Sequence, residues 1–363
     1  MKMKFQYKQI AAIAAIVMII GFFSCNKDVP DPVPITQSDP KGNSIADLLN
    51  APEYSILKAA VTRAGMLTAL SNKTGTFTLF APKNDAFIAS GIPNETVIGL
   101  LPQSTVTALV QYHIIPGLKL GTGDISENYP NVELPTAFTF PAPNTIPFVK
   151  FTTYPSRRGS NVWVNNIPII GKDIEAANGI MHNPPVLIAP PTRVLLDTLS
   201  RDPEMRYLLA AVARADSGRA AGTKFADYLA NPLYSLTIFA PNNQAFQNLL
   251  AAYGLPPDPA AFNFIPVATM QGLLGYHVHI LSGTPPPAFS VKFSRAFSVN
   301  FPATPTPIST FLATVINPAP PIIISSDLGV KGLANATFSN IVAKDRHAVN
   351  GVYHIIDQVL RPQ

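Results

Sequence analysis

The sequence has a single cysteine, Cys25, among its 363 residues. No disulfide can form within the chain, and no cluster of cysteine thiolates can bind a metal ion. Only 13% of the residues are charged. There is no stretch of Lys and Arg interleaved with aromatic side chains, and no glycine-rich loop ending in Gly-Lys-Ser/Thr. These absences argue against a nucleic-acid-binding protein and against a P-loop nucleotide site.

The groups that catalysis needs are also missing. No Gly-x-Ser-x-Gly elbow occurs, and the segment 121–124 lacks the later glycine and the preceding strand of a nucleotide loop. His277 and His279 have a spacing suited to a metal ion on one face of a strand, but no third ligand follows at a regular spacing. Asp173 and Asp345 stand alone, as turn or cap residues do. We therefore expect no enzyme, no metal site and no cofactor.

The first 24 residues have the pattern of a secretory signal. Three lysines precede the apolar run 10–23, which is too short and too early for a membrane-spanning helix. The run ends in the sequence FFSC at 22–25, which resembles the lipobox of bacterial lipoproteins, in which the cysteine is acylated. A leftover cysteine in an ordinary cleaved signal is the alternative, because Phe23 is not small. We expect residues 1–24 to be removed and Cys25 to carry a lipid.

The segment after the cysteine predicts where the protein resides. Asn26, in place of an aspartate, resembles lipoproteins that are sent on to the outer membrane. Residues 26–42 are rich in Pro and Asp and have only three aliphatic side chains, so they predict a tether within the segment 25–42. Three of the five excess positive charges belong to the signal, so the basic pI does not indicate a polyanion ligand.

The rest of the chain is one unit used twice. Thr76–Phe87, TFTLFAPKNDAF, returns as Ser235–Phe246, SLTIFAPNNQAF, with seven of twelve positions identical. The first part of each copy alternates between two faces, which predicts a half-buried strand. The shared proline then ends the strand, and we expect Asn84 or Asn243 to cap the helix that follows.

Other landmarks recur in the same order and divide the chain into two domains. They are 59–64 and 210–215, Tyr112-His113 and Tyr276-His277, and the segments 172–182 and 344–354. The second copy is longer around 218–231, 254–266 and 282–321, as insertions in surface loops would make it. The predicted domains are 43–190 and 192–363.

Each copy is predicted to be α+β, with helices first and a sheet later. Apolar residues repeat at helical spacing in 54–66 and 205–215. Alternating segments punctuated by Pro and Gly predict strands at 132–140, 147–153, 161–170, 288–293, 321–326 and 336–343. This order argues against a doubly wound parallel sheet.

These repeated motifs resemble the fasciclin (FAS1) domain family. The resemblance rests on TLFAP-x-N-x-AF and its second copy, on the two Tyr-His sites, and on the segment from Asn350 to Pro362, which reads NGVYHIIDQVLRP. It covers nearly all of 43–363 as two tandem domains. It implies, for each domain, a wedge of β-strands packed with helices, serving extracellular adhesion or matrix contact without catalysis. The first domain differs from the family pattern at Asn183-Pro184-Pro185, where the family has a strand with Ile-Asp. The sequence therefore does not predict whether the last strand of the first domain forms.

The resemblance also implies candidate binding residues. In animal members the Tyr-His region is implicated in receptor binding, which carries over to Tyr112 and His113 and to Tyr276 and His277. The alternative, which we favour, is that these are buried packing groups with satisfied polar tips.

A second candidate for ligand contact is the Pro-rich insert of the second domain, with Phe289, Phe293 and Phe297. The alternative is that these phenylalanines fill the wedge. The first functional hypothesis is an adhesion lipoprotein of the cell envelope that binds a protein ligand at the cell surface. The other is an accessory glycan-binding lipoprotein of a polysaccharide-capture system, in which exposed aromatic rings stack on sugars.

Overall fold

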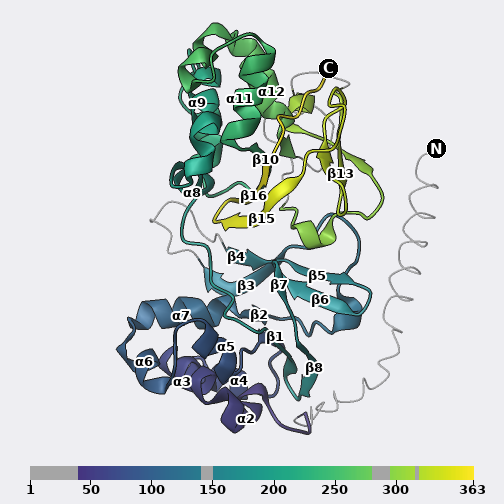
Figure 1. The fold of residues 1–363 in the computed structure, drawn as a ribbon. Coiled ribbons are helices and arrows are strands. Elements are labelled where there is room, and N and C mark those ends of the chain that lie inside the picture. Colours follow the sequence, from purple (N-terminus) through teal and green to yellow (C-terminus); the bar gives the residue numbers. More distant parts are fainter. Residues whose placement is uncertain (1–39, 140–149, 280–294, 315–318) are drawn as a thin grey trace, which may run out of the picture. The chain divides into compact units, whose positions relative to one another are not determined.

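The computed structural model describes residues 40–139, 150–279, 295–314 and 319–363 (Figure 1). Residues Pro40–Gln363 form one compact α+β unit. The predicted signal, Cys25, nearly all of the tether, the predicted strand at 288–293, and Phe289 and Phe293 lie outside the described residues. Among the helices that the structure describes, none is both long and apolar enough to cross a membrane.

The first half carries its helices mostly before its sheets. Its helices are α2 (Ile45–Leu48), η1 (Pro52–Tyr54), α3 (Ser55–Arg63), α4 (Leu67–Ser71), α5 (Asn84–Ala89), α6 (Glu95–Leu100), α7 (Gln103–Tyr112) and η2 (Thr122–Asp124). Its strands are β1 (Phe77–Phe80), β2 (Ile114–Pro116), β3 (Leu134–Thr139), β4 (Lys150–Thr153), β5 (Pro155–Arg158), β6 (Asn161–Val164), β7 (Ile167–Pro168), β8 (Gly171–Ala176) and β9 (Gly179–Asn183).

The second half repeats this order. Its helices are α8 (Leu195–Ser200), η3 (Pro203–Met205), α9 (Arg206–Ala215), α10 (Phe225–Ala230), α11 (Asn243–Ala252), η4 (Pro259–Phe264), α12 (Val267–Tyr276), η5 (Ser298–Asn300) and η6 (Phe311–Thr314). Its strands are β10 (Leu236–Pro241), β11 (Val278–His279), β12 (Thr306–Ile308), β13 (Ile322–Ser325), β14 (Gly329–Lys331), β15 (Ile341–Ala348) and β16 (Gly351–Ile356). The α+β class predicted from the sequence is confirmed.

The two halves share one sheet topology. The main sheets have the orders β2-β1-β9-β8 and β11-β10-β16-β15. In each, the repeated strand pairs in parallel with the last strand of its half and antiparallel with the short strand after the Tyr-His pair. Smaller sheets, β3-β4 and β5-β6-β7 in the first half and β12-β13-β14 in the second, complete the β-structure. The repeat seen in the sequence is therefore a repeat of the fold.

The repeated strand is buried on both faces. Leu79 packs into the helical core of the first half, while Phe80 packs into a separate cluster beneath the smaller strands. Ile238 and Phe239 divide in the same way in the second half. The alternation predicted two faces correctly, but the expectation of a half-buried strand is wrong, because helices cover one face and β-structure covers the other.

The asparagine that follows the strand caps a different helix from the one expected. Helix α5 begins at Asn84 itself, after an N-cap at Lys83. The Asn84 side chain instead accepts from the backbone N–H of Ile56 in α3, at 3.1 Å, and donates to the carbonyl of Pro52, at 2.9 Å. Asn243 makes the equivalent bonds to Tyr207 and Pro203, at 3.1 and 2.8 Å. The residue ties the strand-to-helix turn to the neighbouring helix.

The last strand of the first half is complete. β9 pairs in parallel with β1 over Gly179–His182, although Pro184-Pro185 follows directly. Asn183 ends the strand, donating from Nδ2 to the Tyr54 hydroxyl and the Ala81 carbonyl at 2.9 and 2.7 Å. The side-chain amide thus takes over where the prolines stop the ladder.

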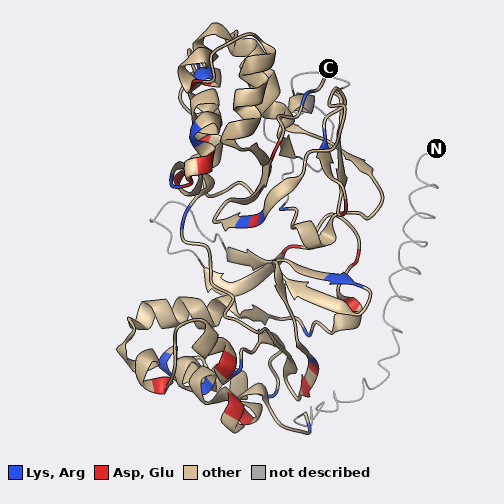
Figure 2. Ribbon diagram, in the orientation of Figure 1, with Lys and Arg blue, Asp and Glu red and all other residues tan. Residues whose placement is uncertain are grey.

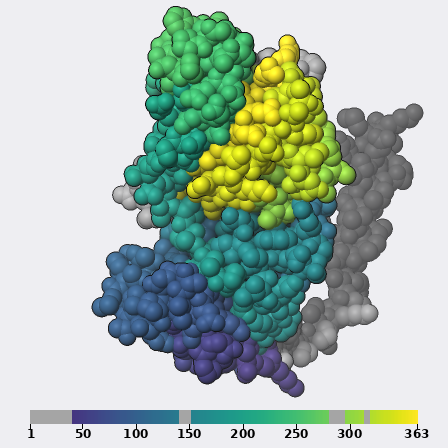
Figure 3. Space-filling view, in the orientation of Figure 1, coloured from purple at the N-terminus to yellow at the C-terminus, as the bar shows by residue number. Residues whose placement is uncertain are grey.

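Direct contacts join the two halves. The Tyr129 hydroxyl lies 2.9 Å from Nε2 of His279, and the backbone N–H of Phe297 donates to Oδ1 of Asn131 at 3.0 Å. The rings of Tyr154 and Phe297 lie 5.2 Å apart between centroids. Figure 3 shows the teal residues of the first half and the yellow-green residues of the second meeting along a shared boundary. The two halves are therefore in direct contact within one compact unit.

Candidate functional site

Each Tyr-His pair lies where a helix turns into a strand of the main sheet. Tyr112 ends α7 and Tyr276 ends α12, and both are fully buried. The Tyr112 hydroxyl donates to the carbonyl of Thr152, at 3.1 Å, and accepts from Nδ2 of Asn165, at 3.3 Å. The Tyr276 hydroxyl donates to the carbonyl of Pro321, at 2.6 Å, and accepts from the backbone N–H of Leu333, at 3.2 Å. Both tyrosines therefore tie their helix to the smaller strands.

The two histidines are held in one tautomer by backbone groups. Nδ1 of His113 donates to the carbonyl of Leu109 at 2.8 Å, and Nε2 accepts from the backbone N–H of Ile188 at 3.0 Å. Nδ1 and Nε2 of His277 have equivalent partners, both in the second half, at 2.8 and 2.9 Å. Because burial disfavours the charged ring, the pKa of each histidine is lowered to about 4. Both rings are neutral at pH 7.

These contacts agree with the packing role favoured from the sequence. The four side chains are at most 2% exposed, so none of them forms part of the surface. The binding role that the family resemblance implies for Tyr112, His113, Tyr276 and His277 stays a prediction.

Replacing Tyr276 with Phe tests the packing role of the tyrosine. The change removes one hydroxyl and leaves a backbone carbonyl and a backbone N–H without that partner. We expect a loss of about 1–2 kcal/mol in the free energy of unfolding, measured by chemical denaturation. Tyr112→Phe is the matched variant in the first half and should lose a similar amount. An unchanged stability in both would contradict the packing role.

The second repeated motif also holds the fold together. Nε2 of His182 donates to the carbonyl of Leu120, and Nε2 of His354 donates to the carbonyl of Ala296, each at 2.8 Å. Nδ1 of His182 accepts the N–H of Asp173, which lies in the left-handed region at φ 56°. These contacts confirm the structural reading of the two histidines.

The His277 and His279 pair does not form a metal site. Nδ1 of His279 donates to the carbonyl of Ser309 at 2.9 Å, and Nε2 is occupied by the hydroxyl of Tyr129. Burial lowers the pKa of His279 to about 4. Within the described residues, no three His, Cys, Asp or Glu side chains are grouped closely enough to hold a metal ion. The side chain instead joins the two halves.

Phe297 is fully buried and belongs to the junction between the halves. It packs with Tyr154 and Val352. It therefore cannot form part of an exposed row of stacking rings, and the alternative reading, that the ring fills the core, holds for this residue. Phe289 and Phe293 lie outside the described residues, so their predicted role is untested.

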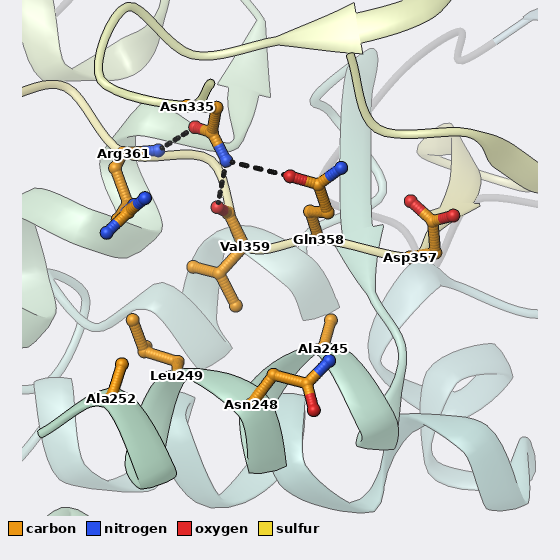
Figure 4. Close-up of a pocket in the computed structure, with 9 residues that line it drawn as sticks. All are labelled: Ala245, Asn248, Leu249, Ala252, Asn335, Asp357, Gln358, Val359 and Arg361. Atoms are coloured by element: carbon orange, nitrogen blue, oxygen red, sulfur yellow. Dashed lines mark hydrogen bonds between the residues drawn. The ribbon is translucent and has the colours of Figure 1, made fainter. Parts of the chain in front are cut away.

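A cavity of about 300 Å³ opens between α11 and the chain that follows β16 (Figure 4). Leu249 lies on the α11 side of the cavity and Val359 on the opposite side, and the Arg361 side chain stands at its edge. The polar groups are largely used within the fold. Asn335 donates to the carbonyl of Val359 at 2.9 Å and accepts from the N–H of Arg361 at 2.8 Å, while Asp357 binds Asn340. The cavity is therefore a gap between α11 and a loop whose polar groups are mostly hydrogen-bonded within the protein.

Sequence reasoning missed the role of the asparagine in the Asn-Gly pair. Asn350 is fully buried, accepts from the N–H of Leu195 at 2.7 Å and donates to the carbonyls of Leu229 and Asn231 at 2.9 and 3.0 Å. Asn178 makes the equivalent bonds in the first half. The signal was available, since the asparagine recurs at an offset of 172 together with its glycine.

Charged groups do not mark out a site either. Figure 2 shows Lys and Arg, and Asp and Glu, scattered over the described parts of both halves rather than gathered on one face. This arrangement agrees with the low charge content of the sequence.

Comparison with known proteins identifies the family. The family model for the fasciclin domain matches residues 52–183. Protein sll1483 of Synechocystis sp. is 33% identical over 141 residues, which is 38% of this chain and 68% of that protein. The chain belongs to the fasciclin domain family. Fasciclin domains are typically binding domains without catalytic activity.

A solved structure of a FAS1 domain pair, from the insect cell adhesion molecule fasciclin I, is also similar. It covers 84% of this chain and 92% of its own, with 18% sequence identity and a TM-score of 0.33.

Proposed function

We propose that this protein is a non-catalytic adhesion lipoprotein of the bacterial cell envelope. In this proposal the lipid on Cys25 holds it in the outer membrane, and residues 26–42 hold the two fasciclin domains away from the bilayer. The domains then contact a protein or matrix ligand at the cell surface.

The duplicated fasciclin fold is the observation that carries the proposal. A binding role fits the condition of the six histidines, the side chains best suited to acid–base catalysis at neutral pH. Five are buried and the sixth, His347, is half-buried, and each is hydrogen-bonded inside the protein. The tether and the lipobox-like sequence support the proposed location in the cell envelope.

Replacing Cys25 with Ser tests the anchor. We expect the variant to lose metabolic labelling with a fatty acid and to leave the membrane fraction, because the hydroxyl does not accept the thioether-linked lipid. The control is Asn26→Asp, which keeps the cysteine and should keep the label while shifting the protein from the outer to the inner membrane fraction. Labelled, membrane-bound Cys25→Ser protein would contradict the proposal.

Adhesion is tested with cells that display the protein. Cells carrying the wild-type chain should adhere to surfaces coated with extracellular matrix proteins more than cells carrying Cys25→Ser. The alternative glycan-binding function predicts instead a signal on a glycan array that Phe289→Ala with Phe293→Ala removes. Adhesion to protein that survives the double change favours the first function. Equal adhesion by the wild type and Cys25→Ser would contradict it.

A further inference from the structure

The two halves can be compared position by position around one cation. Lys119 of the first half corresponds to Arg295 of the second, because the residues that follow them occupy equivalent places. Leu120 and Ala296 donate their backbone N–H to the repeated threonine of the central strand at 2.9 and 2.8 Å. Each carbonyl accepts from the repeated histidine at 2.8 Å. The first half therefore serves as an internal reference for the second.

The partner of this cation differs between the halves. In the first half Lys119 forms an ion pair with Glu175 on β8. The equivalent position on β15 is His347, which is three residues before Asn350 as Glu175 is three residues before Asn178. Nη1 of Arg295 lies 2.7 Å from Nε2 of His347. The second half has kept the cation and replaced the carboxylate with an imidazole.

Arg295 is also buried, whereas Lys119 is not. Only 6% of Arg295 is exposed. Nε donates to Ser235 at 3.1 Å, Nη1 donates to the Ala348 carbonyl at 3.2 Å as well as to His347, and Nη2 donates to the Val349 carbonyl. All these acceptors are neutral. A guanidinium has five N–H donors, so one on Nη2 has no acceptor among the residues that the structure describes.

The imidazole does not supply the missing negative charge. Burial and the adjacent guanidinium lower the pKa of His347 well below its ordinary value, so the ring accepts a hydrogen bond and stays neutral. No carboxylate of the described residues forms an ion pair with Arg295. A buried charge without a counter-charge is costly, and proteins normally pair it.

A small pocket that Arg295 helps to line lies between the two halves. Its volume is about 90 Å³, comparable with a few water molecules. The first half contributes Phe151 and Thr152, with Glu133 exposed, and the second half contributes Leu233 and Arg295 among others. The pocket therefore combines one buried cation with hydroxyl groups and apolar walls.

We propose that this pocket binds a small organic carboxylate, which pairs with Arg295 as Glu175 pairs with Lys119. The remaining N–H on Nη2 can donate to one carboxylate oxygen, and the positive charge of the guanidinium favours the anion. The volume admits a short carbon skeleton, and the apolar walls of Phe151 and Leu233 suit that skeleton better than they suit an inorganic anion. Glu133 near the pocket also disfavours a dianion such as phosphate.

Titration calorimetry on the full chain tests the site, with propionate as the probe. Propionate should bind with a saturable heat, while propionamide, which has the same shape without the charge, should not. Inorganic phosphate should bind at least tenfold more weakly than propionate. Absence of saturable propionate binding, or equal binding of the amide, would overturn the proposal.

The comparison with the first half also suggests a variant that tests the proposal. His347→Glu places in the second half the carboxylate that the first half already has. We expect this variant to fold, with a melting temperature equal to or above that of the wild type, and to bind propionate at least tenfold more weakly. Glu133→Gln should bind propionate more tightly, because a like charge is removed. Unchanged propionate affinity in His347→Glu, or weaker binding by Glu133→Gln, would contradict the assignment.

Discussion

Lowering the pH from 7 to 4 is expected to destabilise the protein strongly, and the second half most of all. All six histidines of the chain have a pKa below the ordinary value, chiefly because burial disfavours the charged ring. For His113, His277 and His279 the lowered pKa is about 4. His113 lies in the first half and the other two lie in the second.

The direction in which stability changes with pH depends on which state, folded or unfolded, binds protons first. In the unfolded chain a histidine takes up its proton as the pH falls through about 6.5, while in the folded protein the same ring stays neutral until about 4. The unfolded state therefore gains protons first, so stability is complete above pH 6.5 and falls steadily toward pH 4. Each of the three rings accounts for about 3 kcal/mol over this range. Their total is similar to the whole stability of an ordinary domain.

Urea unfolding at several pH values between 7 and 4 measures this effect. The slope of the unfolding free energy against pH gives the number of protons taken up on unfolding. His279→Gln is the matched variant, because a glutamine can still donate to Ser309 and accept from Tyr129, and it should lower the proton uptake by about one. A stability that is flat from pH 7 to 4 would show that the rings are protonated in the folded protein.

The sequence predicted what depends on local pattern and on the repeat. A strand followed by a helix was predicted at 76–87 and 235–246, and both copies form one, although β10 continues through Pro241. The helical spacing of 54–66 and 205–215 corresponds to α3 and α9. Two independent copies of each landmark made these predictions firm, because a chance pattern rarely recurs in order.

What the sequence did not predict depends on contacts between distant residues. The parallel pairing of β1 with β9 joins residues about one hundred positions apart, and no local pattern encodes its register. Asn84 looked like a cap for its own helix, but its amide reaches α3, because the fold places that helix N-terminus nearby. The exchange of Glu175 for His347 became meaningful only after hydrogen bonds fixed which positions correspond.

The candidate site shows the same division. Tyr112-His113 and Tyr276-His277 were found from the repeat, and their hydrogen-bond partners came only from the structure. Arg295 was not singled out, since one arginine in a Pro-rich insert carries no local signal. Its burial arises from packing against Tyr154 of the other half, with the guanidinium 5.4 Å from the ring centroid.

Replacing Gly351 with Ala is expected to unfold the second half. The added Cβ would lie 2.5 Å from the carbonyl oxygen of Leu236 and 2.6 Å from the side chain of Leu195. The first contact is with backbone of the central strand, which cannot move without breaking the parallel ladder between β10 and β16. Overpacking in a rigid core costs about 1–3 kcal/mol, and the strained ladder adds to it, so we expect a loss above about 3 kcal/mol.

The first half offers a matched pair of glycines for the same experiment. At Gly179, which has φ 159°, a Cβ would lie 2.0 Å from the carbonyl oxygen of Phe77, so Gly179→Ala should be at least as damaging as Gly351→Ala. Gly99 lies inside α6 with nothing within 4 Å of its Cβ position, and Gly99→Ala should stabilise the protein by about 0.5–1 kcal/mol. Thermal denaturation followed by circular dichroism compares the three variants. Equal melting temperatures for Gly351→Ala and Gly99→Ala would show that the chain does not approach this glycine as closely as the parallel ladder requires.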